Sequence, residues 1–171
     1  MKLLCFFENL FGTVDLNVSK CSKELLGELL TTKLSREAAL DMSRPVCSEE
    51  IKLTMFGINW DKAPRPDGYI AKFFKKTWSV VGKDVVMAVK EFFQTRKMHP
   101  GFNSTIVTLV PKCPNPCSIR DFRPISCCSV IYKCITKIIA NRLKKYMPQL
   151  VGNNQSAFIP GRSITDKIHM A

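Results

Sequence analysis

The stretch Thr105-Ile-Val-Thr-Leu-Val-Pro-Lys112, followed after a loop rich in proline and cysteine by Asp121-Phe-Arg-Pro-Ile-Ser126, decides the fold of this chain. β-Branched and apolar residues in the first segment predict a short strand, buried or half-buried, that ends where Pro111 removes a backbone donor. Arg123 precedes a proline, which favours an extended backbone at that position. The second segment is therefore predicted to return as a second strand of one hairpin-like unit.

Two cations belong to the two arms of this unit. Lys112 ends the first predicted strand, and Arg123 lies where the second begins. A lysine supplies a point charge and an arginine supplies a fork of donors, so the pair suits a phosphate group. The alternative is that both are solvated charges beside a loop, because most surface charges contribute little to binding or stability.

Composition indicates one folded domain with a basic second half. The chain has 171 residues, 46% of them hydrophobic, which is enough for one ordinary domain with a core. The net charge is +12, and residues 92–171 contain 12 Lys and Arg but only two acids, Asp121 and Asp166. Such a field favours a nucleic acid or another phosphate-bearing partner. A membrane surface is the main rival, but the apolar residues are needed for the core.

The eight cysteines do not form a pattern typical of a metal site or of a disulfide framework. Cys113 and Cys117 are four positions apart, no Cys-x-x-Cys pair exists, and His99 and His169 are the two histidines of the sequence. Free thiols are the expectation. The sequence also shows no signal peptide, and it has no apolar run that approaches the roughly 18 residues of a membrane span.

Apolar periodicity predicts helices on both sides of the strand unit. They are expected at 48–60, 69–81, 84–97 and 130–147. Ser48 is the expected N-cap of the first helix, Gly82 the end of the second and Pro148 the stop of the last. Their aromatic and aliphatic residues are interpreted as core.

The remaining segments are predicted to be loops and short elements. Asp67-Gly68 is expected to form the turn of a proline-containing loop that begins near Asp61. Residues 155–162 are predicted to form a short strand and a turn, and Ser163-Ile-Thr-Asp166 a capping box. Residues 5–42 are expected to form two or three short helical pieces.

Four blocks of the sequence, in this order, resemble the reverse transcriptase of plant non-LTR retrotransposons of the LINE class. They are Lys62-Ala-Pro-Arg-Pro-Asp-Gly68; Leu109-Val-Pro-Lys112; Asp121-Phe-Arg-Pro-Ile-Ser126 with Tyr132-Lys133 and Ala140-Asn-Arg-Leu-Lys144; and Gln155-Ser-Ala-Phe-Ile-Pro-Gly-Arg162 with Asp166. Glu49-Glu-Ile-Lys52 is similar to the segment before the polymerase blocks. The resemblance departs at Arg65, where the family usually has glycine, and at Lys167, where it usually has asparagine.

The resemblance implies an α+β fold: the fingers and the first part of the palm of a right-hand polymerase, mostly helical with a short antiparallel strand unit, and truncated. Residues 1–47 are then a helical lead-in, and 48–171 are part of the reverse transcriptase domain. Related polymerases use residues at the positions of Lys112 and Arg123 on the triphosphate of the incoming nucleotide. The contacts implied along template and nucleotide are Asp67, Gln155, Phe158 and Arg162.

The resemblance also implies partners and a metal cofactor, and the sequence lacks the paired aspartates that would hold the metal. RNA template, DNA primer and RNA–DNA hybrid are the implied partners, with no membrane and no identifiable protein partner, and the nucleus is the implied compartment. The complete polymerase is expected to use Mg²⁺ held by clustered carboxylates, but no Asp-Asp pair exists here. The chain is therefore expected to hold no metal, to be inactive alone and to leave Ile106, Leu109 and Ile125 partly exposed. The alternative is a non-catalytic basic nucleic-acid-binding remnant.

Overall fold

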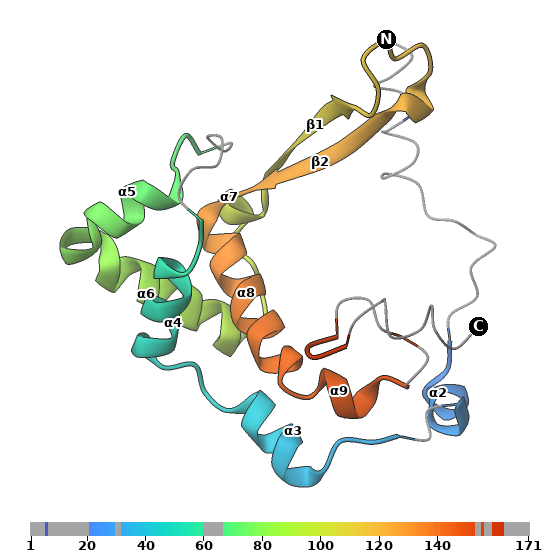
Figure 1. Ribbon diagram of the computed structural model, residues 1–171. Coiled ribbons are helices and arrows are strands. Elements are labelled where there is room, and N and C mark those ends of the chain that lie inside the picture. The colour runs from blue at the N-terminus through green and yellow to red at the C-terminus, as the bar shows by residue number, and fades with distance from the viewer. Residues whose placement is uncertain are drawn as a thin grey trace. The chain divides into compact units, whose positions relative to one another are not determined.

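The computed structural model describes residues 6, 21–29, 32–59, 67–152, 155 and 159–162. The chain divides into two compact units. The smaller unit contains residues 1–33 and 109–124, and the larger contains residues 34–108 and 125–171. Figure 1 shows the helices and strands by label. The fold is mixed, with many helices and one two-stranded sheet among the described residues, which confirms the α+β prediction in its coarse form.

Each element is named by its bounds. The helices are α2 (Lys23–Leu29), α3 (Arg36–Ser43), α4 (Ser48–Phe56), α5 (Ala71–Lys76), α6 (Trp78–Thr95), α7 (Pro100–Asn103), α8 (Val130–Lys144) and α9 (Met147–Leu150). The strands are β1 (Thr105–Pro111) and β2 (Phe122–Cys128), and a 3-10 turn, η1 (Ile119–Asp121), leads into β2.

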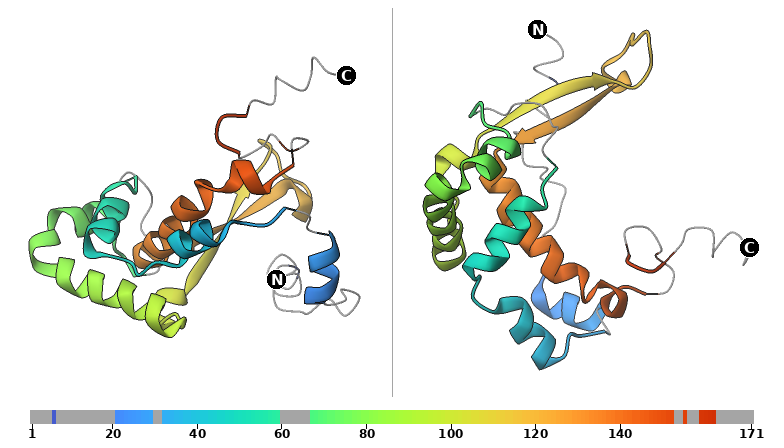
Figure 2. Two further views of the ribbon diagram at one scale, coloured as in Figure 1. Left: turned by 90° about the horizontal axis from the view of Figure 1, so that it is seen from below. Right: turned by 60° about the vertical axis from the view of Figure 1, so that its left-hand side comes forward.

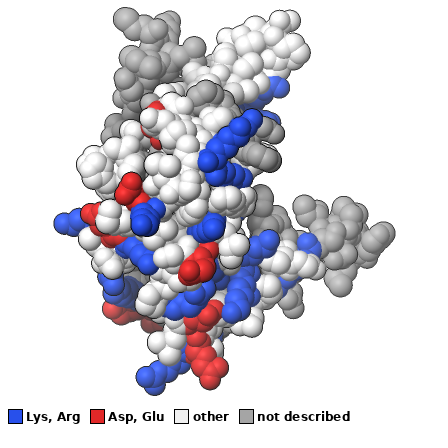
Figure 3. Space-filling view, turned by 90° about the vertical axis from the view of Figure 1, so that its left-hand side faces the viewer, with Lys and Arg blue, Asp and Glu red and all other residues white. Residues whose placement is uncertain are grey.

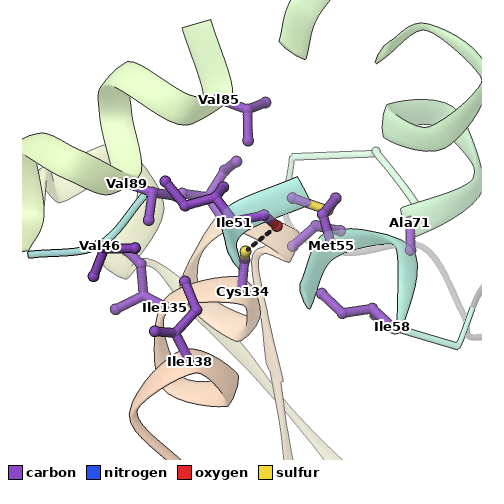
Figure 4. Packing of buried hydrophobic residues seen from close by; sticks show 12 residues of the cluster. Val46, Ile51, Met55, Ile58, Ala71, Val85, Val89, Cys134, Ile135 and Ile138 are labelled. Atoms are coloured by element: carbon purple, nitrogen blue, oxygen red, sulfur yellow. Dashed lines mark hydrogen bonds between the residues drawn. The ribbon is translucent and has the colours of Figure 1, made fainter. Parts of the chain in front are cut away.

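The core of the larger unit lies where α4, α6 and α8 meet. Ile51 and Met55 of α4, Val89 of α6, and Ile135 and Ile138 of α8 are almost completely buried, and Figure 4 shows them packed together. The thiol of Cys134 donates to the carbonyl of Ile51 at 3.8 Å. Burying side chains of this size contributes about 1.5–3 kcal/mol each. The apolar faces predicted for α4 and α8 are thus confirmed at these positions.

The buried stripe of α8 is narrower than the sequence predicts. Ile139 and Leu143 are aliphatic residues of the predicted helix 130–147 and were therefore expected in the core, yet they are 46% and 38% exposed. The neighbouring helices cover the side of α8 that carries Ile131 and Ile138, so residues at the margin of the stripe remain in contact with solvent. Apolar periodicity predicts a face but not how far its partners extend across it.

Helix α4 begins one residue earlier than predicted. Its N-cap is Cys47, whose sulfur accepts from the backbone N–H of Glu50 at 3.4 Å, and Ser48 is already helical. The hydroxyl of Ser48 instead accepts from the Nζ of Lys90 in α6, at 3.1 Å. The prediction of Ser48 as the N-cap was wrong because a tertiary contact occupies its side chain.

The break between α5 and α6 lies at Thr77, not at Gly82. Gly82 is a buried residue inside α6, and a Cβ there would lie 2.9 Å from Cε2 of Trp78. The close approach of the indole ring therefore accounts for the glycine, and the prediction that it ends a helix was wrong. Packing on the Gly82 backbone leaves Trp78 edge-on to Phe56 of α4, with ring centroids 5.6 Å apart.

Helix α8 ends at Lys144, before the proline that was predicted to stop it. Pro148 lies in the first turn of α9, where a missing N–H needs no partner inside the helix. The carboxyl end of α8 is instead a turn in which the N–H of Tyr146 donates to the carbonyl of Leu143 at 2.9 Å.

Strands β1 and β2 run side by side as a long hairpin, as Figures 1 and 2 show. The predicted strand pair is confirmed. However, the hairpin is exposed on both faces, whereas the sequence pattern predicts a buried or half-buried strand. Ile106 and Ile125 are 52% and 47% exposed, and Leu109 is half-buried. Alternation of apolar side chains shows that a face could be covered, but it does not show that a cover is present.

Candidate nucleic-acid interface

The register of the hairpin places Lys112 and Arg123 on one face. The backbone N–H of Lys112 donates to the carbonyl of Asp121 at 2.7 Å, which pairs these two residues. Val110 then lies opposite Arg123, and Lys112 follows Val110 by two residues on the same face. Lys112 and Arg123 are therefore diagonal neighbours, about 7–8 Å apart in an ordinary antiparallel pair. Both residues are exposed.

The same register explains why two prolines are tolerated in the strands. Pro111 and Pro124 fall at positions whose backbone N–H would point away from the partner strand. Each proline therefore removes a donor from the outer edge of the hairpin and none from the ladder. β1 ends at Pro111, as predicted, although the backbone N–H of Lys112 still donates to the carbonyl of Asp121 in the facing strand segment.

A network of hydrogen bonds shapes the turn between the strands. One carboxylate oxygen of Asp121 accepts from the backbone N–H groups of Cys117, at 3.0 Å, and Ser118, at 2.8 Å. Ser118 and Asp121 form a capping box on η1. The Nζ of Lys112 donates to the carbonyl of Arg120 at 2.5 Å, which leaves two of its three donors for another partner. The side chain of Arg123 has no hydrogen bond or ion pair with another described residue.

Asp67 also shapes a turn. Its carboxylate accepts from the backbone N–H of Tyr69 at 3.1 Å, and Gly68 has a positive φ of 74°. This geometry confirms the predicted Asp67-Gly68 turn, because glycine adopts a positive φ without a steric penalty. Residues 60–66 of the same loop, including Arg65, lie outside the described part of the chain.

Arg162 holds together the loop that follows α9. Its guanidinium donates to the carbonyls of Pro148, Val151, Gly152 and Gln155, at distances of 2.7–3.0 Å. Gln155 itself is exposed, and Gly161 has a positive φ of 78° in the adjoining turn. The turn predicted near Arg162 is thus confirmed. The described residues of 155–162 are not in a strand, and Phe158 and the predicted capping box at 163–166 lie outside the described residues.

The predicted site residues thus fall into separate groups. Lys112 and Arg123 come together on the hairpin, within the smaller unit. Gln155 and Arg162 are joined by a hydrogen bond within the larger unit, at 2.9 Å. Asp67 belongs to the larger unit as well, and its carboxylate accepts a hydrogen bond within the turn that it begins.

The sequence interpretation missed an ion pair between α4 and α8. Arg142 donates from Nε and Nη2 to the two carboxylate oxygens of Glu50, at 2.9 and 2.7 Å, and from Nη1 to the carbonyls of Met42 and Arg44. These side chains are 10% and 17% exposed. The hydrogen bond from Arg142 lowers the pKa of Glu50 below its ordinary value of 4.5. No local signal reveals this pair, because its members are far apart in the sequence.

A second network joins α3 to the end of α8. Asp41 accepts from the hydroxyl of Tyr146 at 2.5 Å and from the Nζ of Lys145 at 2.9 Å. The hydrogen bond from Tyr146, followed by that from Lys145, lowers the pKa of Asp41. Together with the hydrogen bonds of Arg142, these bonds connect residues 41–44, which precede α4, to α8 and the turn after it.

Lysines stabilise the end of α4 and line an adjacent groove. Lys75 donates to the carbonyl of Ile58 at 2.6 Å, and Lys137 donates to the carbonyl of Gly57 at 2.5 Å. Cations at a helix carboxyl end interact favourably with its dipole. Lys133 and Lys137 of α8 also line an open groove of about 560 Å³ beside Gly57 and Asn59.

Charges on the helical part are mixed, unlike those of the hairpin. Figure 3 shows basic and acidic side chains interspersed over the visible face of the helices. In the hairpin segment 109–124, Lys112, Arg120 and Arg123 face a single acid, Asp121, in the sequence. Among the described residues, no group of three or more His, Cys, Asp or Glu could hold a metal ion. The described helices are also all too short or too polar to cross a membrane.

Comparisons with known proteins agree with this picture. Residues 110–171 match the profile of a family described as reverse transcriptase (RNA-dependent DNA polymerase). This part of the chain is therefore similar to a segment of a reverse transcriptase. The match begins within β1, just before Lys112, and includes Arg123 and Arg162. The segment thus contains the hairpin tip and α8.

A transposon relative extends the similarity beyond that segment. The chain is 27% identical over 165 residues to the "Transposon TX1 uncharacterized 149 kDa protein" of Xenopus laevis. The alignment covers 96% of this chain but only 12% of the longer protein. The two matches support a fragment of a retrotransposon reverse transcriptase, as the sequence predicts.

Proposed function

We propose that the chain forms the fingers and the first part of the palm of a right-hand polymerase from a plant non-LTR retrotransposon of the LINE class. The reverse transcriptase match and the transposon relative support the general assignment. The ordered blocks from Lys62 to Arg162 support the finer class and the source. Residues 1–47 serve as a lead-in to the polymerase domain, which begins at residue 48 and acts in the nucleus.

In this proposal the hairpin binds the triphosphate of the incoming nucleotide. The observation that carries it is the register that sets Lys112 and Arg123 diagonally on one exposed face. A nucleotide triphosphate offers several anionic oxygens to a lysine and an arginine placed in this way. Lys112 and Arg123 bind and orient the triphosphate, while the nucleotide's base is left to meet the template.

Asp67, Gln155, Phe158 and Arg162 are proposed to line the path of template and nucleotide. Arg162 would do so indirectly, because the carbonyls of residues 148–155 already occupy its guanidinium. Its role is to hold the loop in which the exposed side chain of Gln155 meets the template strand. Asp67 acts similarly, through the turn that it forms with Gly68.

Binding, rather than bond making, is the proposed contribution of this chain. Polymerase chemistry requires Mg²⁺ ions held by clustered carboxylates. The described residues do not fit such a site, and the sequence has no Asp-Asp pair. Alone, the chain is therefore proposed to be inactive, with RNA template, DNA primer and their hybrid as partners of the complete polymerase.

Titration with fluorescently labelled dATP, followed by anisotropy, tests the proposed role of the hairpin. The double variant Lys112→Ala/Arg123→Ala removes both cations, and Lys83→Ala/Lys97→Ala removes the same charge from exposed positions on and just after α6. Losing charge-assisted hydrogen bonds costs about 1.5–3 kcal/mol each. We therefore expect the hairpin variant to bind at least about tenfold more weakly. Equal losses in the two double variants would contradict the proposal.

A second candidate function is nonspecific binding of nucleic acid through the basic half of the chain. The observation in its favour is the excess of 12 basic over two acidic residues in 92–171. Ion pairs reduce that field, since Arg142 is paired with Glu50 and Lys145 with Asp41. Binding of labelled single-stranded RNA at several salt concentrations tests this function. It predicts a steep salt dependence and similar losses when either Lys97 or Lys112, both within 92–171, is replaced by alanine.

A further inference from the structure

Asp121 is bonded to the hairpin turn through both its side chain and its backbone. One carboxylate oxygen accepts two N–H groups, those of Cys117 and Ser118. The hydroxyl of Ser118 accepts from the N–H of Arg120 at 3.3 Å, and Ser118 and Asp121 together form a capping box. Backbone N–H groups at the start of a helical turn have no carbonyl acceptor within that turn, and the carboxylate of Asp121 serves as their acceptor.

These bonds reach Lys112 by two routes. The carbonyl of Asp121 accepts the backbone N–H of Lys112, and the neighbouring carbonyl of Arg120 accepts its Nζ. Both ends of Lys112 are thus held by residues whose backbone the Asp121 carboxylate helps to order. Arg123 follows Asp121 by two residues, at the start of β2, so its backbone position also depends on where η1 ends.

The charge of Asp121 opposes the proposed function of the hairpin. It is the one acid in the sequence segment 109–124, beside three basic residues. If Asp121 acted only through its charge, removing that charge would strengthen the binding of any polyanion. Its hydrogen bonds predict weaker binding instead, because without them the turn would be less ordered and Lys112 would no longer be held in position for the phosphate.

We propose that Asp121 is a positioning residue that holds Lys112 and Arg123 in place for a triphosphate-bearing ligand. This inference rests on the proposed function of the hairpin. Asp121 does not touch the ligand, and its negative charge weakly repels the triphosphate. Its contribution is preorganisation: the turn is ordered before the ligand arrives, so less conformational entropy is lost on binding.

Two substitutions at Asp121 separate the hydrogen bonds from the charge. Asp121→Asn and Asp121→Ala remove the same negative charge, but only asparagine retains an oxygen that can accept both N–H groups. We expect Asp121→Asn to bind labelled dATP as tightly as the unmodified chain, or up to about twofold more tightly. Asp121→Ala should bind about fivefold more weakly, despite having the same charge. Equal affinities of the two variants, whether raised or lowered, would overturn the proposal.

Amide hydrogen exchange gives a readout that does not depend on the ligand. The amides of Lys112, Cys117 and Ser118 should exchange faster in Asp121→Ala than in Asp121→Asn. Unchanged exchange would refute the positioning role even where the affinities differ. Ser118→Ala, which leaves the charge intact, should lie between the two Asp121 variants in both measurements. If the unmodified chain fails to bind dATP, the proposed function fails, while exchange still tests the role of Asp121 in the turn.

Discussion

The helical core and the hairpin tip are stabilised by different forces. In the core, Ile51, Val89 and Ile138 are completely buried, and the hydrophobic effect is the main source of stability. The hairpin tip is exposed on both faces, and polar contacts around Asp121 define its shape. The first region can be damaged by changing volume, whereas the second depends on individual hydrogen bonds.

This difference separates stability from binding. Lys112 and Arg123, the proposed phosphate-binding residues, lie on the hairpin tip. This part of the chain contributes no residue to the buried cluster of α4, α6 and α8. Substitutions in the core should therefore change the free energy of unfolding, but not the affinity of molecules that remain folded. Substitutions at the tip should do the opposite. The following experiments test this separation, beginning with the largest expected effect.

Removing a buried side chain from α8 should have the largest effect. Ile138→Ala leaves a cavity at a position that is 0% exposed, and we expect a loss of about 3 kcal/mol in unfolding free energy. The adjacent Ile139 is 46% exposed, so Ile139→Ala is the matched control and should cost less than about 1 kcal/mol. Urea denaturation followed by circular dichroism measures both. Similar losses would show that α8 is not packed as described.

Breaking the ion pair between α8 and α4 should come next. Arg142→Ala removes the guanidinium that donates to both oxygens of Glu50 and to the carbonyls of Met42 and Arg44. We expect a loss of about 3 kcal/mol at most in unfolding free energy, because the pair is partly exposed. Lys145→Ala removes a basic residue that is 65% exposed in its pair with Asp41, and its loss should be much smaller, because solvent screens the pair. The same denaturation experiment compares them. A loss no larger in Arg142→Ala would mean that the pair does not fasten the two helices.

Glycine substitutions should give opposite signs in two helices. Gly82→Ala places a methyl group 2.9 Å from the ring of Trp78, and we expect a loss of about 1–2 kcal/mol. A Cβ added at Gly27 of α2 would meet no other atom within 4 Å. Because alanine favours the helix over glycine by up to about 1 kcal/mol, Gly27→Ala should increase the helix content. Thermal unfolding and far-ultraviolet circular dichroism check both. Stabilisation by Gly82→Ala would refute the close packing of Trp78.

The pH dependence of stability should show the smallest effect. Because the folded state lowers the pKa of Glu50, its ion pair contributes stability above the ordinary value of 4.5, and this contribution is lost as the pH falls through the lowered pKa. Glu50→Gln should therefore flatten the decline in stability below about pH 4.5. Glu49→Gln removes the same charge from an exposed neighbour and serves as the control. The prediction fails if both variants keep the slope of the unmodified chain.

Elements that depend on nearby residues were predictable from the sequence. The two strands, the Asp67-Gly68 turn and the buried faces of α4 and α8 follow from alternation, turn chemistry and helical periodicity. The role of Asp121 in the turn also had a local signal, because Ser118-x-x-Asp121 fits the spacing of a capping box. That signal was not used in the sequence interpretation.

Other features required contacts between distant parts of the chain. Nothing near Gly82 in the sequence indicates that the Trp78 ring lies on its backbone, and nothing near Arg142 indicates Glu50 as its partner. The occupation of Arg162 by four carbonyls likewise depends on how the loop after α9 returns. A charged residue in a sequence can be read as a ligand-binding group or as a structural one, and only its neighbours in space decide between them.

The sequence by itself determined the identity of the strands and the excess of positive charge. These properties depend on residue spacing and composition, which do not change with packing. The tertiary structure alone decided which cations remain available: Arg142 is bound to Glu50 within the helices, whereas Arg123 has no described partner on the hairpin. The physical reason is that the strength of a charge–charge contact depends on distance and burial, and both are set by the fold.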